Sequence, residues 1–147
     1  MVDQAEDLRR LMKEKQSELE AITGKKEGKG KTRIISITSG KGGVGKTNIA
    51  TNLALSYAKI GKDVIVIDAD LGLANVNVVL GTTPQYNLYH VIKKKKAMRD
   101  IIINTSYGIR LVAGASGFSQ IANMSEEERN SFINELYELS NADIIII

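Results

Sequence analysis

Residues 40–47 have the composition and spacing of a phosphate-binding loop. They read Gly-Lys-Gly-Gly-Val-Gly-Lys-Thr and satisfy the pattern G-x-x-x-x-G-K-[ST] at every position. Glycines allow backbone conformations closed to other residues, so that successive N–H groups can converge on phosphate oxygens. The lysine adds charge near the β- and γ-phosphates, and the threonine hydroxyl can bind Mg²⁺. The expected nucleotide-binding residues are Gly40, Gly42, Gly43, Val44, Gly45, Lys46, Thr47 and Asn48, with Thr47 as a metal ligand.

Two carboxylates follow the apolar run at 64–67. Asp68 and Asp70 are two positions apart, which puts both side chains on the same side of the chain if the strand persists. The carboxyl ends of parallel strands are where ligand sites form in α/β proteins. One carboxylate can hold a water on Mg²⁺ while the other orients an attacking water. The alternative is that both merely cap the turn that follows.

The elements that must position these groups alternate between strands and helices. Short β-branched or apolar runs predict buried strands, whereas apolar residues three and four apart predict helices. The expected strands are 34–37, 64–67, 109–113 and 144–147; the expected helices are 46–60 and 125–140, with weaker helical stretches at 74–80, 86–92 and 97–102. This alternation predicts an α/β fold of the P-loop NTPase type, in which helices flank a parallel sheet.

The first 32 residues have a different character from the rest. A narrow apolar stripe and a capping box at Asp3 and Glu6 predict an amphipathic helix over 1–22. Residues 23–32 contain no apolar side chain and are rich in glycine and lysine, which is typical of a flexible tether. The expected domains are therefore this helix, the linker and a nucleotide-binding domain over 33–147.

Composition narrows the functional classes. The chain has 147 residues, 43% of them hydrophobic, and a net charge of +3, which suits one globular domain. It contains no cysteine, so neither an iron–sulfur cluster nor a thiolate zinc site can be ligated within it. The basic cluster at 93–96 has no interleaved aromatic residues in the sequence, which favours a solvated loop, and no nucleic-acid partner is expected.

The lysine after the first glycine extends the motif. The form K-G-G-V-G-K-T at 41–47 resembles the deviant Walker A signature of the MinD/ParA group of P-loop ATPases. The resemblance implies that Lys41 reaches the partner's phosphates across an ATP-dependent homodimer. It further implies that Asp68 lies in the outer shell of the metal and that Asp70 positions the nucleophile. The implied catalytic residues are Lys41, Lys46 and Asp70, and the implied cofactors are ATP or ADP with Mg²⁺.

Three segments resemble one branch of that group, the flagellar-number regulators FlhG, also called FleN or YlxH. They are Asp-Gln-Ala-Glu-Asp-Leu-Arg at 3–9, the stretch 68–81 and Gly-Ala-Ser-Gly at 114–117. The resemblance implies that the N-terminal helix stimulates the signal-recognition-type GTPase FlhF. A tethered amphipathic helix that docks in a groove is an established recognition mode. The expected partner-binding residues are Asp3, Gln4, Ala5, Leu8, Arg9, Leu11 and Met12.

The resemblance covers the N-terminal half of a typical member. In the family the strand at 144–147 continues into an aspartate and a D-[ST]-x-A-G loop, and a C-terminal amphipathic helix binds the membrane. The chain is therefore expected to bind nucleotide weakly and to hydrolyse little by itself. The full-length protein is expected in the cytoplasm, peripheral to the inner face of the cell membrane. Alternatives are a ParA-like partitioning ATPase and a nucleotide-gated binding module without significant hydrolysis.

Overall fold

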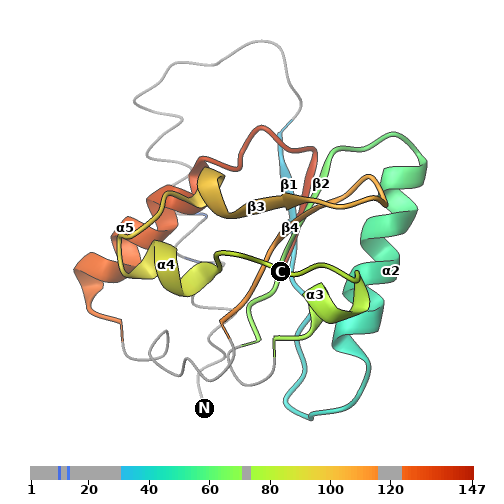
Figure 1. Ribbon diagram of the computed structural model, residues 1–147, viewed down its shortest axis with the longest axis horizontal. Helices are drawn as coiled ribbons and strands as arrows, with labels where there is room; N and C mark the ends of the chain where they lie inside the picture. Colours follow the sequence, from blue (N-terminus) through green and yellow to red (C-terminus); the bar gives the residue numbers. More distant parts are fainter. Residues whose placement is uncertain (1–9, 11–12, 14–30, 71–73, 116–123) are drawn as a thin grey trace. The chain divides into compact units, whose positions relative to one another are not determined.

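The computed structural model describes residues 10, 13, 31–70, 74–115 and 124–147 (Figure 1). The chain forms two compact units, Met1–Lys31 and Thr32–Ile147. In the first unit, Arg10 and Lys13 are both helical. The expected partner-binding residues Asp3, Gln4, Ala5, Leu8, Arg9, Leu11 and Met12 lie outside the described residues, as do 23–30 of the expected linker.

The second unit is built on a five-stranded sheet with the order β1-β5-β2-β4-β3. Its strands are β1 (Arg33–Ile35), β2 (Val64–Ile67), β3 (Ile102–Asn104), β4 (Arg110–Val112) and β5 (Ile144–Ile146). The first, fifth, second and fourth strands are mutually parallel. β2 and β5 are buried along their whole length, as expected for parallel strands covered on both faces. The expected α/β fold is thus confirmed.

β3 is an addition to the expected strands. It pairs antiparallel with β4, and Ile103 lies opposite Leu111. The expected helical stretch at 97–102 is instead one 3-10 turn, η1 (Met98–Ile101), followed at once by β3. Three consecutive isoleucines at 101–103 favour extended backbone, because β-branched side chains are stiff in a helix.

Helices lie on both sides of the sheet in Figure 1, with α2 (Lys46–Lys59) and α3 (Val76–Val79) on one side and α4 (Leu88–Ile92) and α5 (Glu126–Tyr137) on the other. α2 buries its small residues Ala50 and Ala54 against Val64, Val66 and their neighbours. The expected capping box of α5 is present. The Ser125 hydroxyl accepts from the Glu128 N–H at 3.1 Å, and the Ser125 N–H donates to Glu128 Oε2 at 3.0 Å.

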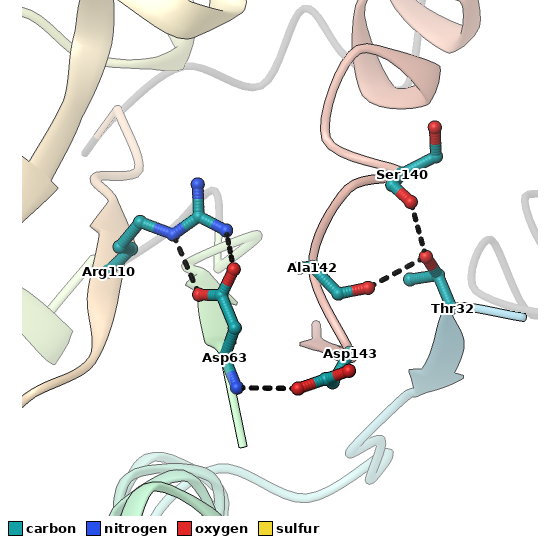
Figure 2. A network of polar contacts seen from close by, with 6 residues as sticks. All are labelled: Thr32, Asp63, Arg110, Ser140, Ala142 and Asp143. Carbon is teal, nitrogen blue, oxygen red and sulfur yellow. Dashed lines mark hydrogen bonds and ion pairs between the residues drawn. The ribbon is translucent and has the colours of Figure 1, made fainter. Parts of the chain in front are cut away.

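A polar network joins the amino ends of the strands (Figure 2). The Asp63 N–H donates to Asp143 Oδ2 at 2.8 Å, and the Asp143 N–H donates to the Asp63 carbonyl at 2.9 Å. The Thr32 hydroxyl lies 2.6 Å from the Ser140 carbonyl oxygen and 2.7 Å from that of Ala142. Thr32, placed in the linker by the sequence, is therefore fastened to the sheet domain, and Asp143 lies at the edge opposite the phosphate loop.

The described helices include none with the length and apolar character needed to cross a lipid bilayer.

Candidate nucleotide-binding site

The parallel strands bring the phosphate loop and the carboxylate pair to the same edge of the sheet. The loop follows β1, and Asp68 directly follows β2, with β5 between these two strands. Hydrogen bonding between β1 and β5 continues beyond the strands, since the Ile37 N–H donates to the Ile147 carbonyl at 2.7 Å. The start of the loop is therefore held at a fixed place beside the carboxyl end of β5.

The loop backbone has the conformation that its glycines permit. Gly43 has φ 73° and Gly45 has φ 90°, in the left-handed region that other residue types enter at a cost. A Cβ added at Gly40, Gly42, Gly43 or Gly45 would meet nothing within 4 Å, so the space beside the loop is open. These four positions thus leave room for a ligand to approach the backbone.

The N-terminus of α2 supplies backbone hydrogen-bond donors for an anion. The Ile49 N–H makes the first bond of the helix, to the Gly45 carbonyl at 2.9 Å. Within the part of the chain that the structure describes, the N–H groups from Gly42 to Asn48 donate to no protein acceptor. Unpaired N–H groups at the start of a fourteen-residue helix attract anions, because the helix dipole is positive there. The loop therefore fits a phosphate group.

The two lysines differ in exposure. Lys41 is exposed, and its backbone N–H donates to Ser39 Oγ at 3.2 Å. Lys46 and Thr47 are half-buried in the first turn of α2, and Val44 between the lysines is 47% exposed. Lys46 and Thr47 are thus partly enclosed by the chain, whereas Lys41 is exposed to solvent.

Asp68 is buried, and its carboxylate closes the loop that follows β2. Oδ1 accepts from the Asp70 N–H at 3.1 Å, and Oδ2 accepts from the Val76 N–H at 3.0 Å. Burial raises the pKa of this carboxyl above its ordinary value, while the N–H groups of Val76, Asp70 and Asn75 act in the opposite direction. The turn-capping alternative is therefore what the geometry displays for Asp68, and its role near a metal stays a prediction.

Asp70 is exposed at the same edge. Its backbone is fixed by Asp68, while its side chain lies where solvent can reach it. The two carboxylates thus have different environments: Asp68 is buried and organises the loop, whereas Asp70 is exposed. Residues 71–73, which follow, lie outside the described part of the chain.

Gly114 lies against the loop that begins at Asp68, whereas the sequence marked it only as part of the segment 114–117 that resembles the flagellar branch. A Cβ at this position would overlap the Asp68 carbonyl oxygen and lie 2.9 Å from the Ala74 Cβ. The sequence signal for close packing at this position was a glycine immediately after the expected strand at 109–113. A glycine in that place is often required by close backbone approach.

Two features outside this edge have structural explanations. His90 Nδ1 accepts from the Asn87 N–H at 3.2 Å and thereby completes the cap of α4. In the basic cluster, Lys95 Nζ lies 5.6 Å from the Tyr89 ring centroid and Lys96 Nζ lies 4.3 Å from that of Tyr86. The lysines therefore cover ring faces that a stacking base would need.

A glycine-rich loop between a buried strand and a helix, with carboxylates after a neighbouring strand, defines the class of P-loop nucleotide-binding α/β proteins. The profile of the family described as "AAA domain" matches residues 32–147. The chain belongs to this family, and within it to the MinD/ParA-type ATPases with a deviant Walker A loop.

Relatives of known name agree with this assignment. The chain is similar to the antiactivator FleN of Pseudomonas aeruginosa, with 41% identity over 116 residues, which are 78% of this chain and 41% of FleN. It is 42% identical to the flagellum site-determining protein YlxH of Helicobacter pylori over 122 residues, or 82% of this chain and 42% of YlxH. The chain therefore spans about two fifths of the length of these relatives.

A solved structure agrees in fold and in ligands. The septum site-determining protein MinD of Pyrococcus horikoshii, in complex with Mg-ADP, superimposes with a TM-score of 0.64 and 31% identity. The match covers 79% of this chain and 48% of MinD. The expected adenine nucleotide and Mg²⁺ are thus the ligands that this related structure holds.

Proposed function

We propose that the chain is the nucleotide-binding part of a MgATP-dependent, dimerising ATPase switch that controls flagellar number and placement. The observation that carries this proposal is the loop at 40–47 with the start of α2. Among the described residues, the seven successive N–H groups from Gly42 to Asn48 donate to no protein acceptor. The loop also contains Lys41 as well as Lys46. An anion cradle with one half-buried and one exposed lysine suits a nucleotide that is contacted by two protomers.

The residues divide the work between them. Lys46 and the loop N–H groups hold the phosphates, and Thr47 provides a hydroxyl ligand for Mg²⁺, which supplies charge neutralisation when bound. Asp70 orients the attacking water, with Asp68 fixing its backbone and lying in the outer shell of the metal. Lys41 crosses to the nucleotide of the second protomer and makes turnover depend on dimerisation.

The N-terminal helix is proposed to stimulate the signal-recognition-type GTPase FlhF through Gln4 and the residues around it. The similarity to FleN and YlxH supports a flagellar role rather than a partitioning role. The full-length protein is proposed to be cytoplasmic and to reach the inner face of the membrane through a C-terminal helix.

The test is a matched pair of lysine variants in the full-length protein. Nucleotide affinity is measured with a fluorescent ATP analogue, oligomeric state by light scattering, and turnover by phosphate release. Lys46→Ala should abolish binding, because the phosphates lose their charged partner. Lys41→Ala should keep most of the affinity but lose ATP-dependent dimerisation and turnover.

Two outcomes would contradict the proposal. Lys41→Ala turning over ATP at the wild-type rate would remove the dimer mechanism. If the wild-type full-length protein did not bind nucleotide, the proposed nucleotide-dependent switch would be ruled out. A protein that binds and dimerises without turnover would instead support the nucleotide-gated binding module.

A further inference from the structure

Three consecutive residues at the end of β4 contact either the loop that begins at Asp68 or the start of α4. The Val112 carbonyl accepts from the Asp68 N–H at 3.0 Å, and the Ala113 carbonyl accepts from the Leu88 N–H at the start of α4, also at 3.0 Å. Gly114, the next residue, faces the Asp68 carbonyl and Ala74. The strand end thus lies against Asp68 and Ala74 of the loop that follows β2.

The contact at Gly114 leaves no room for a side chain. The obstacle is a backbone carbonyl, which cannot rotate away as the end of a flexible side chain could. A methyl group there must therefore displace the backbone at Asp68, or move β4, whose pairing with β2 is fixed at Ile67 and Val112. Because the Asp68 N–H donates to the Val112 carbonyl, either movement would shift Asp68.

A displacement at Asp68 would travel to Asp70. The Asp68 carboxylate accepts from the N–H groups of Asp70 and Val76, so it ties both ends of the loop to one side chain. A shift of this carboxylate would change where the Asp70 side chain lies relative to the phosphate loop. Small displacements of a group that orients a reacting water are costly in rate.

We propose that Gly114 is a positioning residue of the ATPase site, whose missing side chain lets Asp68 hold Asp70 in register with the phosphate loop. The inference rests on the proposed function, since it assigns Gly114 to the turnover attributed to Asp70. The atoms nearest to a Cβ at Gly114 belong to Asp68 and Ala74 rather than to the phosphate loop, so Gly114 sets the rate of turnover and leaves nucleotide affinity alone.

The experiment compares Gly114→Ala with wild type in the full-length protein. Hydrogen exchange of the Asp70 and Val76 amides without nucleotide should be at least about tenfold faster in the variant. The value of kcat should fall at least about tenfold, with the affinity for a fluorescent ATP analogue unchanged. Leu111→Ala is the control, because it weakens the same buried strand without adding bulk beside Asp68. Leu111→Ala should speed amide exchange in β2 and in the loop together, whereas Gly114→Ala should speed amide exchange in the loop alone.

A second substitution separates the two contacts. Adding Ala74→Gly to Gly114→Ala removes the side-chain contact but leaves the Asp68 carbonyl, so it should restore kcat and protection only in part. If Gly114→Ala does not fold, the double variant decides, since it keeps the overlap with the Asp68 carbonyl and should still speed exchange at Asp70 and Val76.

The results separate the inference from the proposed function. Loop exchange equal to wild type in Gly114→Ala, or in the double variant where the single one does not fold, overturns the inference whatever the rate of turnover. If the wild-type protein shows no ATP turnover, the proposed function fails, and the exchange measurement still decides whether Gly114 positions the loop.

Discussion

Arg110 and Asp63 form a two-point ion pair that links the first residue of β4 to the residue before β2. Arg110 Nη2 lies 2.7 Å from Asp63 Oδ2, and Nε lies 3.1 Å from Oδ1 (Figure 2). The Asp63 backbone is bonded in turn to Asp143, which precedes β5. Three neighbouring strands are thus fastened at the edge opposite the nucleotide loop.

Arg110→Ala should lower the free energy of unfolding by about 1 kcal/mol, the upper end for a surface pair, because the geometry is bidentate. Chemical denaturation of both proteins measures the difference. Arg99→Ala is the control: Arg99 Nε lies 4.0 Å from Asp100 Oδ1, and its side chain is 77% exposed. An equal loss of unfolding free energy in both variants would mean that the bidentate ion pair between Arg110 and Asp63 does not stabilise the protein.

Thr51→Val should stabilise the protein by about 1 kcal/mol. Thr51 is 3% exposed on the buried face of α2, and its hydroxyl has no partner among the described residues. Valine keeps the shape and removes the unsatisfied group, with similar helix propensity. Thermal unfolding provides the measurement, and Thr51→Ser, which keeps the hydroxyl but loses the methyl group, should move the midpoint the other way. A destabilised valine variant would show that the hydroxyl does have a partner.

Asp68 should make stability fall as the pH rises. Its pKa in the folded protein lies above the ordinary 3.8, so the folded state keeps the proton to a higher pH than the unfolded chain. The stability that this proton contributes is complete below 3.8 and is lost as the pH rises through the folded pKa. Unfolding free energies of wild type and Asp68→Asn at a series of pH values isolate the effect. If the wild type instead became more stable relative to Asp68→Asn as the pH rises, folding would lower the pKa of Asp68 rather than raise it.

Gln4→Ala should leave ATP binding and turnover intact and lose the stimulation of FlhF. The reason is that the proposed activator contacts lie in the N-terminal helix, away from the loop in the sequence. GTP hydrolysis by FlhF, measured with increasing amounts of each variant, tests this. Gln16→Ala, which removes the same side chain outside the motif at 3–9, is the matched control and should stimulate fully. Full stimulation by the Gln4 variant would refute the activator role.

The parts of the fold that could be predicted are those determined by residues close together in the sequence. The phosphate loop depends on glycines and lysines that are adjacent in the chain, and the buried strands on short runs of branched residues. Two parts depended on distant partners instead. The Thr32 hydroxyl bonds to Ser140 and Ala142, which are 108 and 110 positions away. The role of Gly114 appears only when β4 lies beside β2.

β3 was missed for a different reason. Its residues follow a turn of 3-10 helix without a break, and hydrophobic periodicity alone does not assign so short an apolar run, although its β-branched residues favour a strand. Asp68 was placed at the correct edge, but its hydrogen bonds to both ends of the loop depend on the path taken by residues up to Val76.

The order of the strands also decides when the nucleotide site can exist. β1 and β2 do not pair with each other; each pairs with β5, whose Ile144 lies beside both Arg33 and Val64. A ribosome makes the phosphate loop early and β5 more than 90 residues later. Until then, the strand that lies between β1 and β2 in the sheet is missing. On a nascent chain, tight nucleotide binding would therefore report the arrival of residues 144–146 rather than the synthesis of the loop.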